Sequence, residues 1–192
     1  MSKYTIAAIV AIFIVFGIFI YISEQKPVAL NTSSNTQNTQ EVAPNPADMT
    51  ARQLVDLCTT DMATQFHIHS HVTIMANKQN ITIPQNTGID IQKNCMSSLH
   101  THDTSGVVHI EAPIKKDFTL GDFFYKWGKP LSSTQVLDYQ TDMEHALKVY
   151  VDGKEVSDPS TIILKDHEEI FIDYYAIKDG PDKIPEAMKW EE

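Results

Sequence analysis

The chain has 192 residues, with 15 Lys or Arg against 25 Asp or Glu, which gives a formal net charge of −10 at pH 7. This length accommodates one domain plus appendages. The acidic balance argues against a nucleic-acid partner, which would need a basic patch, and is compatible with attracting cations.

Residues 1–26 are predicted to form a transmembrane anchor. Thr5 to Ile22 is an 18-residue run without a charged side chain, long enough to span a bilayer as a helix. No small-residue cleavage site follows, which favours an uncleaved signal-anchor over a cleaved signal peptide. Lys3 and Lys26 flank the run and barely set its orientation. We expect a single-pass cell-membrane protein whose C-terminal domain is extracytoplasmic, because two cysteines in that domain suit an oxidising compartment.

Residues 27–50 are predicted to be a disordered linker. Asn31 to Gln40 contains no apolar side chain, and Pro44 and Pro46 follow. Such a segment cannot bury enough surface to offset its ordering entropy, so it suits a flexible stalk. Residues 178–192 are predicted to be an irregular acidic tail.

Residues 51–177 are predicted to form an α+β, mainly β domain: a small antiparallel sheet or sandwich with two short helices. Thr50 can cap the first helix. Thr119 and Asp122 form a capping-box-like pair for the second helix, and Gly128 suits its end. Alternating runs and turn residues predict strands at about 67–75, 81–83, 88–91, 107–111, 146–151, 154–156, 161–164 and 169–174.

Three histidine-containing runs dominate the domain, and their histidines recur at every second position. Residues two apart on a strand share a face. Each run, read as a strand, therefore has an apolar face for the core and a face of imidazoles. The three runs contain, in order, His67, His69 and His71; His100, His102 and Asp103; and His109 and Glu111. The remaining two, His145 and His167, stand alone and are expected to be structural.

This clustering predicts a transition-metal site, since neutral imidazole is a common ligand for copper and zinc. All six clustered histidines are candidate ligands, with Asp103 and Glu111 as auxiliary ligands or orienting groups. Copper is the first expectation and zinc the second. The spacing matches no zinc finger, no helical His-Glu-x-x-His pair and no cupin pattern. A solvent-exposed polar strand face is the structural alternative.

Two cysteines, Cys58 and Cys95, each precede a histidine run. If the runs are neighbouring strands, the cysteines can meet and form one disulfide. The alternative is that Cys95 supplies a copper thiolate, although no methionine follows at the spacing of a cupredoxin loop.

Three runs together resemble an uncharacterised family of membrane-anchored extracytoplasmic proteins of archaea, including ammonia oxidisers, and of actinobacteria. They are Phe66 to His71, Leu99 to Glu111 (Leu-His-Thr-His-Asp, then Gly-Val-Val-His-Ile-Glu) and Phe118 to Gly128 (containing Thr-Leu-Gly-Asp-Phe-Phe). The resemblance covers roughly residues 56–174. It implies that the runs and both cysteines belong to one domain, and it names neither substrate nor activity.

Three function classes remain open. The first is an anchored module that binds copper or zinc. The second is a metal-dependent hydrolase or oxidase, for which Glu111 or Asp103 would be the candidate general base and no catalytic residue is assigned. The third is a non-metal surface or assembly module. The sequence contains no nucleophile motif, phosphate loop or nucleotide fingerprint, which places binding ahead of catalysis.

Overall fold

The computed structural model describes residues 44–60 and 65–190. The predicted anchor, and the predicted linker up to residue 43, lie outside the described residues. Within the described ranges, no helix is both long and apolar enough to cross a membrane.

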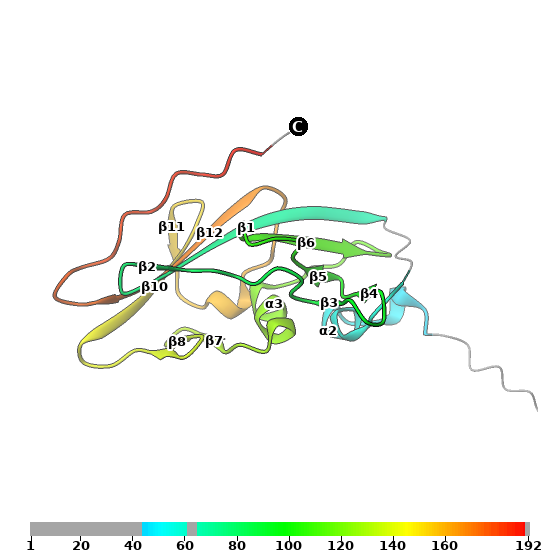
Figure 1. The fold of residues 1–192 in the computed structure, drawn as a ribbon, viewed down its shortest axis with the longest axis horizontal. Helices are drawn as coiled ribbons and strands as arrows, with labels where there is room; N and C mark the ends of the chain where they lie inside the picture. Colours follow the sequence, from blue (N-terminus) through cyan, green and yellow to red (C-terminus); the bar gives the residue numbers. More distant parts are fainter. Residues whose placement is uncertain (1–43, 61–64, 191–192) are drawn as a thin grey trace, which may run out of the picture. The chain divides into compact units, whose positions relative to one another are not determined.

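A seven-stranded sheet organises the domain, with the strand order β11-β10-β12-β1-β6-β5 and β2 paired to β1 (Figure 1). The prediction of a mainly β domain with two short helices is confirmed. The seven strands are β1 (Phe66–Ala76), β2 (Gln79–Ile81), β5 (Leu99–His100), β6 (Val107–Ala112), β10 (His145–Val151), β11 (Lys154–Val156) and β12 (Glu168–Ala176).

The sheet is mixed, whereas the sequence predicted an antiparallel one. β1 pairs in parallel with β12, with Ser70 opposite Glu168 and Ala76 opposite Tyr174. These strands are separated by most of the domain's length, which leaves enough chain for the crossover that a parallel pair requires. The tight hairpins β1–β2 and β10–β11 are antiparallel, and residues at their turns have positive φ, Asn77 (50°) and Asp152 (48°) among them.

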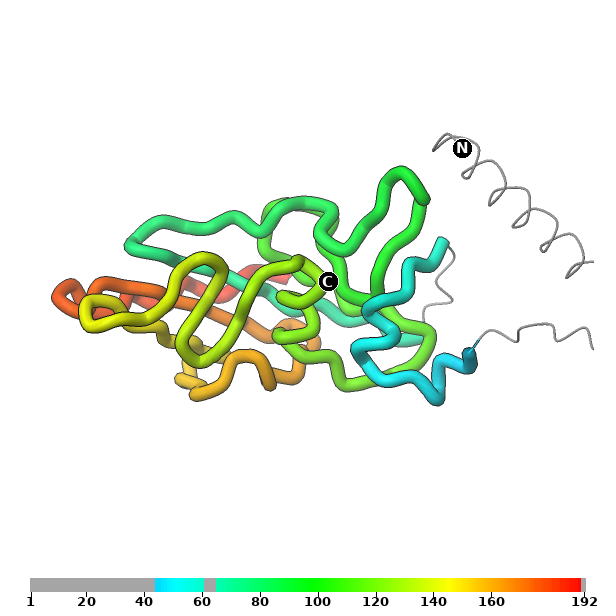
Figure 2. Tube along the Cα trace, turned by 90° about the horizontal axis from the view of Figure 1, so that it is seen from below, coloured from blue at the N-terminus to red at the C-terminus, as the bar shows by residue number. Residues whose placement is uncertain are grey.

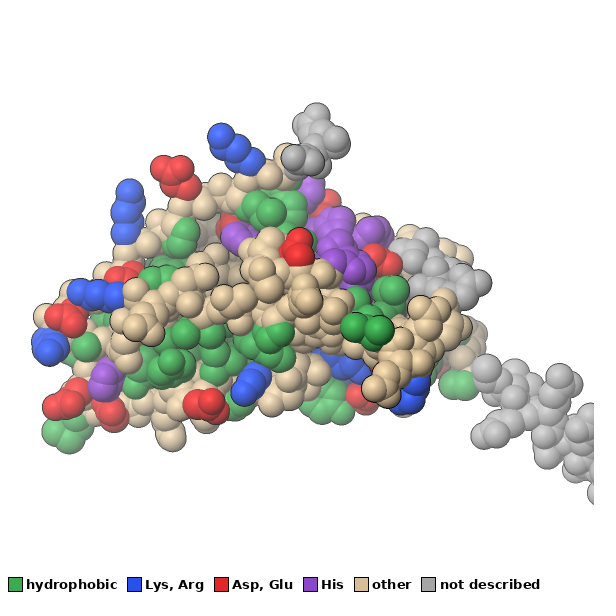
Figure 3. Space-filling model, in the orientation of Figure 1, with side chains coloured by type: hydrophobic (Ala, Val, Ile, Leu, Met, Phe, Trp, Pro, Cys, Tyr) green, Lys and Arg blue, Asp and Glu red, His purple; other side chains and the backbone are tan. Residues whose placement is uncertain are grey.

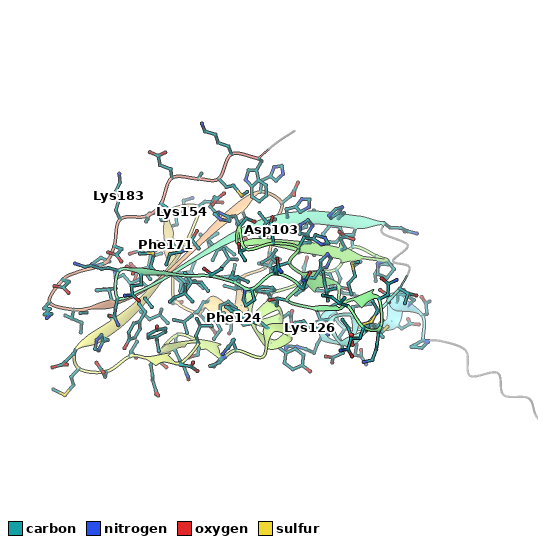
Figure 4. The ribbon with its side chains drawn as sticks, in the orientation of Figure 1. Asp103, Phe124, Lys126, Lys154, Phe171 and Lys183 are labelled. Carbon is teal, nitrogen blue, oxygen red and sulfur yellow. A yellow bond between two sulfur atoms is a disulfide. The ribbon has the colours of Figure 1, made fainter. Side chains whose placement is uncertain are left out.

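The sheet's apolar face packs on both helices, α2 (Ala51–Asp56) and α3 (Leu120–Trp127). Both predicted helix starts are confirmed: Thr50 and Thr119 each form a capping box. Burial alternates along β6, as expected for a strand with one face in the core. Phe124 of α3 lies beneath the sheet in Figure 4 and is 1% exposed.

Residues 129–164 differ most from the prediction. Three short strands, β7 (Leu131–Ser132), β8 (Gln135–Val136) and β9 (Tyr139–Gln140), form a separate small sheet that the sequence analysis missed (Figure 2). The predicted strand at 161–164 was wrong. A 3-10 helix, η2 (Pro159–Thr161), begins this segment, and Ile163 makes only one bridge, to Thr119. Pro159 lacks the N–H that a strand ladder needs, and Asp158 caps the turn instead.

The disulfide between Cys58 and Cys95 is present and spans 37 positions of sequence. Cys95 lies in β4 (Cys95–Met96), which pairs with β3 (Ile89–Asp90). Met96 also bridges to Thr59, so the disulfide and this bridge attach the segment after α2 to β4. The copper-thiolate alternative for Cys95 is excluded, because the sulfur is bonded to Cys58.

The folded chain begins before the predicted boundary at residue 51, and the predicted irregular tail packs on the sheet. Pro46–Asp48 forms a 3-10 helix, η1, and Met49 is buried in the core, so the last residues assigned to the linker are folded. Residues 177–190 form no helix or strand, yet they run along the sheet's other face (Figure 1). The backbone N–H of Asp182 donates to Asp173 and that of Met188 donates to Glu169.

Candidate metal centre

Three neighbouring strands place three histidines in one row. His109 on β6 lies opposite His69 on β1 and opposite His100 on β5. Because β6 lies between β1 and β5, the first and second histidine runs are not neighbouring strands. The condition under which the sequence allowed the two cysteines to meet is therefore not fulfilled. His67 and Glu111 face each other in the next row of the same face. Most of the histidine side chains visible in Figure 3 gather in one patch.

The ring nitrogens of five predicted ligands lie close together. Nε2 of His100 is 3.2 Å from Nε2 of His102, although His102 lies beyond the end of β5. Nδ1 of His109 is 3.1 Å from Nε2 of His69 and 3.5 Å from Nε2 of His67. Two nitrogens bound tetrahedrally to one zinc ion lie about 3.4 Å apart, given Zn–N bonds of about 2.05 Å. The spacing is therefore that of atoms able to share an ion.

Glu111 adds a carboxylate to these imidazoles. Its Oε1 lies 3.1 Å from Nε2 of His67 and 3.8 Å from both Nε2 of His100 and Nδ1 of His109. Two groups result, and within each group the candidate ligand atoms all lie within 4.8 Å of one another. The inner group is His100, His102, His109 and Glu111. The outer group is His67, His69 and His109.

The position of His100 determines which of its nitrogens can bind an ion. The side chain is fully buried, and its Nδ1 lies 3.0 Å from the backbone carbonyl oxygen of Ser97. A carbonyl only accepts hydrogen bonds, so Nδ1 carries the proton and Nε2 keeps its lone pair in the neutral ring. That lone pair faces His102 and Glu111. A backbone carbonyl commonly orients a metal-ligating imidazole in this way.

Burial keeps several of these rings neutral. Desolvation, followed by repulsion from His69, His102, His100 and His67, lowers the pKa of His109 to about 3. Desolvation is also the main cause that lowers the pKa of His100 and of His69. An imidazole binds a metal ion in its neutral form. Because these three rings are already neutral at pH 7, they can bind an ion without first releasing a proton.

His71 and Asp103 lie apart from both groups, although the sequence proposed them as ligand and auxiliary ligand. The Nδ1 of His71 is 2.7 Å from Glu169 on β12, and its Nε2 is 3.1 Å from the backbone oxygen of Ser105. Both of its nitrogens are thus occupied by oxygen acceptors. Asp103 accepts hydrogen bonds from the backbone N–H and hydroxyl of Ser105, which lower its pKa. Figure 4 shows Asp103 beside β6.

A third group, which was not predicted from the sequence, joins His69 to the loop before β12. Asp166 and His167 offer ligand atoms within 4.8 Å of that of His69. The expectation that His167 stands alone is therefore wrong. Asp166 also accepts a hydrogen bond from the backbone N–H of His69, and Trp190 stacks on His167 with 4.5 Å between ring centroids. Only the parallel pairing of β1 with β12 brings these residues together.

A pocket of about 480 Å³ opens beside the outer group. Strand, loop and tail residues line it: His69, Asp103, Ser105, Val107, His109, His167, Met188, Lys189 and Trp190. Two of its lining residues, His69 and His109, belong to the outer group. The pocket therefore gives small molecules a route to that side of the cluster.

Comparison of the chain with models of known protein families, with curated proteins and with solved structures found no match. The resemblance carried by the three sequence runs therefore stays a prediction.

Proposed function

We propose that this protein is a membrane-anchored module that binds a transition-metal ion, copper first and zinc second, on the outer side of the membrane. One observation carries the proposal. The inner group assembles three imidazoles and a carboxylate from two chain segments, with one imidazole held by a backbone carbonyl in the tautomer that leaves Nε2 free.

The electrostatics of the cluster support a bound cation. Five imidazoles turn ring nitrogens toward one another or toward Glu111, and burial opposes the protonation of His69, His100 and His109. Each neutral ring offers one lone pair, so a metal ion between these nitrogens would be bound by several imidazoles at once. A nitrogen-rich donor set binds Cu(II) more strongly than Zn(II) by the Irving–Williams order, although metal availability also decides occupancy.

The first experiment is metal analysis of untagged full-length protein purified without a nickel column. We expect at least one equivalent of copper or zinc to survive dialysis against micromolar metal. His69 and His100 replaced together by Ala should abolish stoichiometric binding. The matched control is His145→Ala, because His145 binds Asp142 and stacks on Tyr174, outside all three groups. Substantially less than one equivalent in the wild type would favour the non-metal surface module.

The location outside the membrane is part of the proposal. The disulfide supports an oxidising compartment, and the uncharged run from Thr5 to Ile22 supports an integral anchor. Alkaline carbonate washing should leave the protein in the membrane pellet, and protease added to intact cells should remove the domain. Release by carbonate, or an N-terminus mapped near residue 27, would contradict the anchor.

The pocket supports a second candidate function, a metal-dependent enzyme. A reactant could reach an ion at the outer group through this opening, and Glu111 lies close enough to serve as a general base. The test is turnover of a chromogenic ester by zinc-loaded protein. Loss of turnover in Glu111→Gln with zinc still bound supports catalysis, whereas an unchanged rate contradicts this role.

A further inference from the structure

The cluster holds more ligands than one ion normally takes. Zinc takes four ligands at a structural site, whereas the inner and outer groups together offer six side chains. Ligands on opposite sides of one ion are at most about 4.2 Å apart, twice a metal–nitrogen bond of about 2.1 Å. When all ligand atoms of a group must lie within 4.8 Å of one another, the six side chains form two groups rather than one. This separation fits two ion positions better than one.

The order of the strands explains the separation. β6 lies between β5 and β1, so the backbones of His100 and His69 are two strand spacings, about 9.6 Å, apart. His109 on the middle strand belongs to both groups. The oxygen of Glu111 also reaches both, at 3.1 Å from Nε2 of His67 and 3.8 Å from Nε2 of His100. These two side chains therefore lie between the two positions.

We propose that the domain holds two metal ions, and this inference rests on the metal-binding function proposed above. His100 and His102 bind the inner ion, while His67 and His69 bind the outer ion. Glu111 bridges them, because a carboxylate has two oxygens and paired ions in proteins typically lie about 3.5–4 Å apart. His109 completes one of the two coordination shells.

The two positions differ in their exposure to solvent. The inner group contains the fully buried His100 as well as the exposed His102, whereas the outer group has no fully buried member and its His67 side chain is 44% exposed. The pocket is lined by His69, which belongs to the outer but not the inner group, and by the shared His109, so it opens on the outer position. The outer ion should therefore exchange more readily, bind more weakly and accept a small anion from solution.

The test is a Cu(II) titration of the untagged full-length chain in detergent, against a chelator of known affinity. We expect two equivalents with unequal affinities in the wild type. His67→Ala should remove the weaker equivalent and leave the tighter one, whereas His102→Ala should weaken the tighter one. Both side chains are exposed, so their truncation should preserve the fold, as circular dichroism can verify. His145→Ala is the control and should keep both equivalents.

Electron paramagnetic resonance supplies an independent readout. Two Cu(II) ions about 3.5–4 Å apart couple magnetically. With one equivalent of copper bound, the number of spins detected should equal the amount of bound copper. With two equivalents bound, it should fall well below that amount. Azide added at two equivalents should perturb the absorption spectrum of the wild type, and His67→Ala should remove that response. A wild type that binds one equivalent overturns the two-ion inference alone, whereas one that binds none overturns the proposed function as well.

Discussion

The neutral imidazole of His109 should make the metal-free domain sensitive to acid. The perturbation is a change from pH 7 to pH 4.5 in the presence of a chelator. In the unfolded chain His109 has an ordinary pKa of about 6.5 and is protonated at pH 4.5. In the folded domain its pKa is lowered to about 3, so the ring stays neutral at that pH.

The sign of the effect follows from proton binding. Between pH 6.5 and about 3 the unfolded state binds one more proton than the folded state, so the free energy of unfolding falls as the pH falls through this window. At pH 4.5 the loss from His109 should be about 3 kcal/mol, because about two pKa units separate pH 4.5 from the ordinary value and each is worth roughly 1.4 kcal/mol. The ring is only 20% exposed, so solvent screens its surroundings weakly. Above pH 6.5 this contribution should be constant.

The assay compares the wild type with His109→Gln by urea unfolding at both pH values. His69 and His100 also lower the free energy of unfolding as the pH falls, because their pKa values in the folded domain are lowered too. Glu168 and Asp173 act oppositely, because burial raises their pKa values. All four groups are present in both proteins, so the difference between the two pH responses isolates the effect of His109. If both proteins lose the same stability within about 0.5 kcal/mol, a neutral His109 in the folded state is refuted.

Three further predictions concern the framework of the site. Cys58→Ser with Cys95→Ser should lower the free energy of unfolding by about 4 kcal/mol, the chain-entropy estimate for a 37-residue separation, and a loss below about 1 kcal/mol in chemical denaturation would contradict it. Gly88→Ala should lower both the copper affinity and the stability of the domain, because Gly88 has φ +78° and a Cβ there would overlap the backbone oxygen of Leu99, next to His100. The control is Gly153→Ala, which has the same φ but open space around it. It should leave the copper affinity unchanged in the same titration. Phe124→Ala should cost about 3–5 kcal/mol by calorimetry, whereas Tyr125→Ala at the exposed neighbouring position should cost about 1 kcal/mol or less; equal losses would mean that α3 does not pack as described.

Local patterns in the sequence were sufficient to identify most individual elements. The alternation around His67 and Val108 predicts β1 and β6, because period-two burial is a property of each strand by itself. Thr119 and Gly128 predict the ends of α3, because caps satisfy backbone groups within a few residues. The disulfide followed from having two cysteines in a domain expected to be extracytoplasmic, although the reason offered, adjacent histidine runs, was wrong.

The tertiary structure alone decided which histidines meet. Strand order is set by long-range packing, and it placed β6 between the other two runs, so His109 became the shared centre of the cluster. The parallel pairing of β1 with β12 gave His71 an acidic partner in Glu169 and brought His167 to His69. Residue type and spacing could therefore indicate a histidine cluster. The ligand groups, the tautomer of His100 and the lowered pKa of His109 depend on neighbours from distant parts of the chain, which only the folded domain supplies.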